Sequence, residues 1–241
     1  MASGSTLYLS LFVYLALFTL SSQSDEKVTL DVYYESLCPG SSQFIVDYLP
    51  VLFDSDLISI VDLKLSPYGN TKLYPWIPGE PITNATFYCQ HGEYECLLDI
   101  VQACAIDIWP EVIKHFSFIH CIEKLVSQGK ETEWESCFDK LDLDPEPIKQ
   151  CYTSDYGEKL ELKYAAETAA LQPRKLYVPW VVLNGEPLYE DIDNYISRIC
   201  SAYKGSDAFE ICGRASNLRQ VKGKPKPSVC YMERGMSTWE K

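Results

Sequence analysis

Apolar positions over residues 28–65 follow a strand, helix and strand pattern. Val28 to Tyr34, "VTLDVYY", is β-branched and aromatic, which predicts a strand. Between residues 41 and 53 the apolar side chains recur at helical spacing, which predicts a helix. Leu57 to Leu65 alternates between apolar and polar positions and predicts a second strand, ended by "SPYGN" at residues 66–70.

Residues 89 to about 172 follow a different pattern. They hold six cysteines and few strand signals, and their helical periodicity breaks near Pro110. A further helical stretch begins at about Glu146 or Ile148. We therefore expect this segment to be a helical insertion.

Strand signals return beyond the insertion. Tyr177 to Leu183, "YVPWVVL", predicts a strand, Asn184-Gly185 predicts a hairpin, and "EPLY" begins the returning strand. Asp191 to Tyr203 predicts a closing helix, with Asp191 as its N-cap.

This order of elements is that of an α/β thioredoxin-like fold. A strand–helix–strand half and a strand–strand–helix half are separated by the helical insertion at about 89–172. We expect one domain over residues 25–212, because the insertion begins and ends within the connectivity of one sheet.

The first 24 residues are typical of a secretory signal. Leu7 to Leu20 is an apolar run followed by the small polar residues 21–24. The run is shorter than the roughly 20 residues that a membrane helix needs. A membrane anchor is the alternative, since no Lys or Arg precedes the run. Asn84-Ala85-Thr86 is a sequon for N-glycosylation at Asn84, which suits a surface loop of an exported protein.

Composition and charge narrow the class further. The 241 residues are 46% hydrophobic, enough for a packed core, and carry a net charge of −13. Residues 213–241 hold seven Lys or Arg and two Asp or Glu, a balance of +5 that leaves −18 for the rest. Such an acidic body argues against nucleic-acid binding. We expect residues 213–241 to be a basic flexible tail that is mobile or removable, with an interaction arm as the alternative.

Candidate chemistry centres on Cys38, in "LCPGSS" between the first strand and the first helix. A thiol reacts as its thiolate, and a helix N-terminus favours the anion. A lone cysteine before a helix is usually structural. Here, however, it ends the strand that opens the domain, where a redox protein of this fold has its nucleophile.

Val178-Pro179 lies at the start of the third predicted strand. In thioredoxin-like folds a cis-proline at this place lies against the reactive sulfur, and the preceding residue pairs with a substrate strand. The cis bond is accessible almost only before proline. We therefore expect Pro179 to be cis in the active site and Val178 to bind substrate, with a trans proline on an edge strand as the alternative.

The segment "CQHGEYECLLDIVQAC", residues 89–104, resembles the signature of the gamma-interferon-inducible lysosomal thiol reductase (GILT) family. That signature is Cys-Gln-His-Gly, two residues, Glu-Cys, two residues, Asn, four residues, Cys, and Asp99 stands where the family has Asn. "YYESLCP", "PYGN", "LQP" and "YVPWVVLNGEPL" also resemble family segments, especially those of plant members. The resemblance implies a thioredoxin-like fold, secretion or delivery to a lysosome or vacuole, and reduction of protein disulfides by a Cys-x-x-Cys pair.

The resemblance places Cys38 at the first cysteine of that pair and Ser41 at the second. A hydroxyl does not release a substrate from a mixed disulfide, although Ser41 can hydrogen-bond a thiolate. Three hypotheses follow: monothiol reduction or isomerisation, with release by a small thiol or by the substrate's own thiol; a non-catalytic substrate-binding or trapping protein; and a redox-inactive, disulfide-rich secreted protein. The presence of Cys38, of the strand before it and of Pro179 favours the first two hypotheses over the third, and the first is the one we prefer.

Ten cysteines in an exported chain predict disulfides. We expect Cys200 and Cys212 to close the last loop. The six cysteines of the insertion should pair among themselves, in a connectivity that the sequence leaves open: Cys89, Cys96, Cys104, Cys121, Cys137 and Cys151. Cys230 then remains in the tail, to cap Cys38, join another chain or leave with the tail; a resolving role for Cys230 is not favoured.

Other cofactors are not expected. Zinc at Cys89, His91, Cys96 and Cys104 is the weaker alternative to disulfides, because the spacing matches no zinc pattern. We expect neither metal nor cofactor, and protein disulfides and a small thiol as partners, without nucleic acid and without a membrane once the signal is removed.

Overall fold

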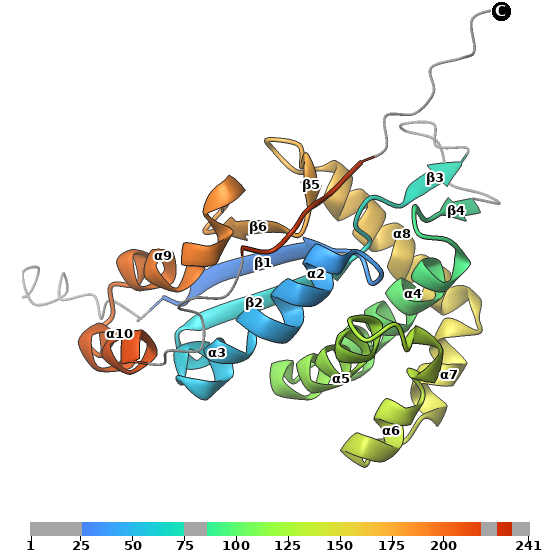
Figure 1. Ribbon diagram of the computed structural model, residues 1–241, viewed down its shortest axis with the longest axis horizontal. Helices are drawn as coiled ribbons and strands as arrows, with labels where there is room; N and C mark the ends of the chain where they lie inside the picture. The colour runs from blue at the N-terminus through green and yellow to red at the C-terminus, as the bar shows by residue number, and fades with distance from the viewer. Residues whose placement is uncertain (1–25, 75–85, 218–225, 233–241) are drawn as a thin grey trace, which may run out of the picture.

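A four-stranded sheet forms the centre of the molecule. The computed structural model describes residues 26–74, 86–217 and 226–232, so the expected signal at 1–24 and Asn84 lie outside the described residues. β1 (Val28–Tyr34) pairs in parallel with β2 (Val61–Pro67) and antiparallel with β6 (Trp180–Leu183). β7 (Glu186–Pro187) adds to β6, which gives the order β2-β1-β6-β7. The strands predicted at the two halves of the chain therefore share one sheet (Figure 1).

The connection from β1 to β2 is mostly helical. It comprises α2 (Pro39–Gln43), a π-helical turn at Phe44–Tyr48 and α3 (Pro50–Asp54), close to the predicted helix. The prediction of a strand from Leu57 is wrong at its start. Asp56 has a left-handed backbone with φ 60°, and Leu57–Ser59 forms a 3₁₀ turn whose buried Leu57 mimics the apolar alternation of a strand.

The insertion is helical and has a core of its own. β3 (Lys72–Tyr74) and β4 (Thr86–Tyr88) pair before it. It then contains α4 (Glu93–Ile108), α5 (Val112–Val126), a 3₁₀ turn at Glu131–Glu133, α6 (Ser136–Leu141), α7 (Glu146–Tyr152) and α8 (Asp155–Ala169). Most buried apolar residues of these helices form a cluster separate from the one on the sheet, to which Phe116 and Ile119 of α5 belong. In Figure 1 they group at the opposite end of the molecule from α9 (Tyr195–Ala202) and α10 (Ala208–Asn217).

The third predicted strand divides at Pro179. β5 (Tyr177–Val178) leaves the central sheet, and β6 pairs with β1. Asn184 and Gly185 turn the hairpin with φ of 47° and 83°, values that suit the Asn-Gly pair.

The closing helix begins later than the sequence predicts. Tyr189–Asn194 is a 3₁₀ turn, and α9 starts at Tyr195 with Asn194 as its N-cap. Asp191 is therefore not the N-cap of this helix. Its carboxylate instead accepts hydrogen bonds from the side chains of Asn194 and Arg198, which compete with a capping role.

The region beyond residue 212 departs from the expected flexible tail. α10 continues to Asn217, and residues 226–232 lie on the body of the protein, where β8 (Cys230–Tyr231) pairs antiparallel with β5. The sequence did not indicate β8, because two residues are too few to show the alternation of apolar and polar positions that marks a strand. Among the described residues, no helix has the length and apolar character required to cross a bilayer.

Candidate active site

Cys38 lies at the junction of β1 and α2. It is the N-cap of α2, with Pro39 in the first turn, where the missing N–H of proline needs no partner. Its side chain is 0% exposed, and so is that of Ser41. The cysteine thus has the place that the sequence predicts, but solvent does not reach it.

The sulfur of Cys38 is bonded to the sulfur of Cys230. Of the three possibilities that the sequence leaves open for Cys230, the structure has the one in which it caps Cys38. The two residues are 192 positions apart in the chain, and only the docking of residues 226–232 brings them together. All ten cysteines lie in described residues, and they form five disulfides.

The segment that carries Cys230 is held as an added strand. Val178 lies opposite Cys230 and Tyr177 opposite Tyr231 in an antiparallel pair. The Cys38 sulfur lies 3.7 Å from the carbonyl oxygen of Val178, and the Val178–Pro179 peptide bond is cis. Strand addition of this kind is a common way to bind an extended peptide. Residues 230–231 therefore occupy the place expected for a substrate strand.

Gly40 allows the close approach of this segment. A Cβ atom at Gly40 would lie 1.8 Å from the carbonyl oxygen of Ser228. Beside it, Ser41 accepts a hydrogen bond from the backbone N–H of Glu35 at 3.5 Å, so its hydroxyl faces the end of β1. Ser41 thus makes a backbone contact in this oxidised state, rather than the contact with a Cys38 thiolate that its position suggested.

Asn70, the last residue of "PYGN", joins three parts of the site. Its backbone N–H donates to Glu35 at 2.7 Å, and its side-chain amide donates to the carbonyl oxygen of Cys230 at 3.0 Å. The amide oxygen accepts from the buried Lys175 at 2.7 Å.

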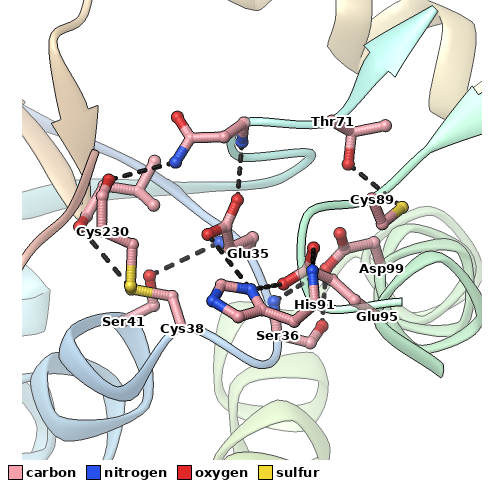
Figure 2. A network of polar contacts seen from close by, with 12 residues as sticks. Glu35, Ser36, Cys38, Ser41, Thr71, Cys89, His91, Glu95, Asp99 and Cys230 are labelled. Carbon is pink, nitrogen blue, oxygen red and sulfur yellow. Dashed lines mark hydrogen bonds and ion pairs between the residues drawn. A yellow bond between two sulfur atoms is a disulfide. The ribbon is translucent and has the colours of Figure 1, made fainter. Parts of the chain in front are cut away.

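Glu35 and His91 lie next to the disulfide. Glu35 is 0% exposed, and burial raises its pKa to about 8, with the Glu95 carboxylate adding to the shift and Asn70 and Lys175 opposing it. His91 Nδ1 lies 2.5 Å from Glu95 Oε2 and 3.6 Å from Glu35 Oε1. The GILT-like signature thereby places its histidine and its glutamate against the residue three places before Cys38 (Figure 2).

More buried carboxyls lie beneath this site. Asp99 accepts from the backbone N–H and the hydroxyl of Ser36, at 2.9 and 2.6 Å. Burial and then the neighbouring Glu161 raise the pKa of Asp99 well above its usual value. Glu123 accepts from Ser42 and Gln102, and burial raises its pKa to about 8. A protonated carboxyl is therefore favoured at several buried positions at neutral pH.

The signature cysteines are in disulfides. Cys89 pairs with Cys96, Cys104 with Cys151, Cys121 with Cys137 and Cys200 with Cys212. Glu35, His91 and Cys230 place one ligand atom each within 4.8 Å of one another. Because the Cys230 sulfur is in a disulfide, this set offers no thiolate to a cation in the oxidised protein.

Several residues of the site were not predicted. Glu35, Asn70 and Lys175 come from three separate segments and meet only in the folded chain. The available signals were the quoted segments "YYESLCP" and "PYGN", which hold two of them.

Two solved structures have a similar fold. They are the MdbA thiol-disulfide oxidoreductase from Actinomyces oris (TM-score 0.52, 15% identity, 75% of this chain and 84% of that one) and the reduced disulfide oxidoreductase DsbG from Mycobacterium tuberculosis (TM-score 0.51, 14% identity, 81% and 88%). At such identities the likeness concerns the fold, and it confirms the thioredoxin-like class with a helical insertion.

Sequence comparisons reach further. Residues 29–141 match the family model "Gamma interferon inducible lysosomal thiol reductase (GILT)". The "Gamma-interferon-responsive lysosomal thiol protein" of Arabidopsis thaliana is 40% identical over 96% of this chain and 97% of its own. The "Gamma-interferon-inducible lysosomal thiol reductase" of Mus musculus is 33% identical over 85% of this chain and 76% of its own. With Cys38 in the turn, a cis-proline strand beside it and these relatives along nearly its whole length, this chain belongs to the GILT family.

Proposed function

We propose that this protein catalyses thiol–disulfide exchange on protein disulfides, with Cys38 as the attacking thiol. The observation that carries the proposal is the bond between Cys38 and Cys230, whose strand pairs with Val178. A cysteine held on that strand has the arrangement of a mixed disulfide between the enzyme and an extended substrate. Membership of a thiol reductase family supports the same chemistry.

The different burial of Cys38 and Cys230 favours one route for release. Cys38 and Ser41 are 0% exposed, whereas Cys230 is partly exposed. A second thiol therefore reaches the sulfur on the substrate side more easily than the sulfur of Cys38, and access decides which sulfur is attacked. Cys38 then leaves as the thiolate.

Exchange by this route needs no external oxidant, because each step breaks one disulfide bond and forms another. In the first step the Cys38 thiolate bonds to one substrate sulfur, the substrate disulfide breaks, and the second substrate sulfur leaves with the electron pair. In the next step a thiol attacks the sulfur held on Cys38. If the thiol belongs to the substrate, the product is a rearranged disulfide; if it is a small thiol, a second such thiol completes the reduction.

Residues 226–232 are the first peptide that must leave the site. A small thiol that attacks Cys230 opens the bond and frees Cys38 for a substrate. The export signal expected at residues 1–24 and the GILT relatives support work in the secretory pathway, either outside the cell or in a lysosome or vacuole, where disulfide-containing proteins and small thiols meet.

The test follows the order of these bonds. The native protein is treated with glutathione, quenched in acid and mapped by mass spectrometry. We expect glutathione on Cys230 and a free Cys38 that iodoacetamide labels. The freed protein should then rearrange a scrambled disulfide peptide, and Cys38→Ala should not. A Cys38 that stays unlabelled at every pH up to about 8, near the thiol pKa, would refute the function.

A redox-inactive protein is the second candidate, because all ten cysteines are paired. It predicts that the Cys38–Cys230 bond reduces no faster than Cys104–Cys151, in the insertion. The substrate-trapping alternative predicts a stable mixed disulfide at Cys38 with no turnover. The same glutathione experiment separates these outcomes, since the proposed enzyme requires both fast opening and multiple turnovers.

A further inference from the structure

A carboxyl group and an imidazole ring lie beside the sulfur of Cys230. A carboxylate oxygen of Glu35, a ring nitrogen of His91 and the Cys230 sulfur all lie within 4.8 Å of one another. In Figure 2 the His91 ring lies below Glu35, on the side of the disulfide. Since Cys230 occupies the place of a substrate cysteine, the pair lies beside the sulfur that a substrate would contribute.

The carboxyl group of Glu35 has one oxygen held and one oxygen available. Oε2 accepts from the backbone N–H of Asn70 at 2.7 Å. Oε1 is buried and has no hydrogen-bond partner among the described residues, and it lies 3.6 Å from His91 Nδ1. Buried polar atoms nearly always have partners, so an unpartnered one at a reactive sulfur points to a role there.

His91 connects Glu35 to solvent. Its side chain is 31% exposed, whereas those of Glu35 and Glu95 are 0% exposed. Glu95 fixes the ring, because its carboxylate lies 2.5 Å from Nδ1 and also accepts from the His91 backbone N–H at 3.2 Å. The Cys89–Cys96 disulfide closes the loop that carries the histidine.

We propose that Glu35 gives and takes the proton of the thiols that exchange at the substrate sulfur, and that His91 passes this proton to and from solvent. The proposal rests on the proposed function of Cys38. When Cys38 attacks, the leaving substrate thiolate takes a proton from Glu35, directly or through one water. In the release step a second thiol enters and gives its proton to Glu35. The sulfur of this entering thiol bonds to the substrate sulfur, and Cys38 leaves with the electron pair.

The acidity of Glu35 suits this exchange. Burial raises its pKa to about 8, near the value of about 8.5 of a free thiol, and matched acidities favour proton transfer. The titratable groups that face Glu35 are His91, Glu95 and Asp99, all within residues 91–99, and Lys175. Below about pH 8 the carboxyl is mostly protonated and able to donate.

The test compares two leaving groups on the full mature chain with Cys230→Ser, which leaves Cys38 free. Oxidised glutathione releases an alkyl thiolate that needs a proton, whereas dithiobis-nitrobenzoate releases a stable aromatic thiolate that does not. We expect Glu35→Gln to slow attack on oxidised glutathione by about ten- to a hundredfold at mildly acidic pH, and attack on the aromatic disulfide by less than about threefold. The deficit should shrink above about pH 8.5, where an alkyl thiolate leaves without a proton.

The aromatic disulfide also reports on the fold and on Cys38 in the same sample. Equal losses with both disulfides would mean a structural role and would overturn the proposal, as would no loss with either. If the parent Cys230→Ser protein reacts with neither, the function of Cys38 fails instead. Glu123→Gln is the matched control, because it removes another buried carboxyl with a pKa of about 8 whose partners are Ser42 and Gln102.

The relay has a readout of its own. We expect His91→Gln to slow the glutathione reaction at low buffer concentration, and imidazole in solution to restore the rate, because a small base can replace a partly exposed relay. Imidazole should not restore Glu35→Gln, whose site is buried. Loss in His91→Gln without rescue would remove the relay from the proposal.

Discussion

The sulfur of Cys38 lies 3.7 Å from the carbonyl oxygen of Val178, the residue directly opposite Cys230 in the strand pair. One residue of β5 therefore sets both the position of the attacking sulfur and the register of the peptide beside it. A substrate cysteine that pairs with Val178 is delivered to Cys38 by the backbone alone. The residues on either side of the substrate cysteine can therefore vary in type, because main-chain hydrogen bonds supply much of the affinity in such binding.

The approach of that peptide depends on Gly40. We expect Gly40→Ala to prevent docking of residues 226–232, because the new Cβ would lie 1.8 Å from the Ser228 carbonyl oxygen. The equilibrium constant for the Cys38–Cys230 bond in a glutathione redox buffer should fall at least about tenfold, which corresponds to about 1.4 kcal/mol. Gly213→Ala, whose added methyl meets no atom within 4 Å, serves as the control. An unchanged constant would contradict the docked segment.

Ser41 is the position at which net reduction can be restored. In Ser41→Cys a second thiol lies one helical turn after Cys38, so it can attack the mixed disulfide from within the protein. We expect at least about tenfold faster reduction of a disulfide-linked peptide with dithiothreitol as donor, given the high effective concentration of an intramolecular thiol. Ser42→Cys, one residue further, is the control. No gain would mean that the site has lost more than the resolving thiol.

Asn70 links the docked peptide to the acidic site. We expect Asn70→Ala to free the carbonyl of Cys230 and to leave buried Lys175 without its amide partner, at a cost of about 1–3 kcal/mol in unfolding free energy. Glutathione should also open the Cys38–Cys230 bond faster. Urea unfolding and the opening rate measure the two effects. Thr71→Val, which changes a neighbouring buried residue, should leave the opening rate unchanged.

The buried carboxyls should contribute less to stability as the pH rises from acidic to neutral. A carboxyl whose pKa is raised on folding holds its proton in the folded state and loses it in the unfolded state, so unfolding becomes easier as pH rises between the two values. For Glu123 that interval runs from the unfolded value of about 4.3 to the folded value of about 8. Within it, each such group contributes a slope of about 1.4 kcal/mol per pH unit.

The substitution Glu123→Gln removes one of these titratable carboxyl groups. We expect the unfolding free energy at neutral pH to rise relative to wild type and its slope with pH to decrease by about 1.4 kcal/mol per unit. Urea unfolding at several pH values across the interval measures both quantities. Glu158→Gln, on the exposed side of α8, should leave the slope as it is. A slope that Glu123→Gln does not change would show that this carboxyl is ionised in the folded protein.

Local patterns in the sequence predicted local structure well. β1 has the bounds expected from its β-branched and aromatic residues, and Asn184-Gly185 forms the expected turn. The predictions for Leu57–Ser59 and Asp191 are wrong because both segments form 3₁₀ turns, which also place apolar residues at short intervals. At Asp191 the carboxylate is bonded to Asn194 and Arg198 instead of capping the helix.

The site was predictable only where one segment holds it. Cys38 and Pro179 each follow from a local motif and its place in the order of strands. Glu35, His91 and Cys230 do not, because their contacts join positions far apart in the chain and no periodicity records such a meeting. The basic composition of residues 213–241 predicts a flexible tail, but the strand at Cys230 is held by main-chain pairing, which does not depend on charge.

The bond between Cys38 and Cys230 makes a ring of most of the chain. A cross-link between residues 192 positions apart lowers the conformational entropy of the unfolded chain. In the chain-entropy model this raises the free energy of unfolding by about 5 kcal/mol. The first thiol that opens this bond therefore also lowers the free energy of unfolding of the whole protein. Its melting temperature should act as a gauge of redox state, with the resting form the most heat-resistant and the working form the most easily degraded.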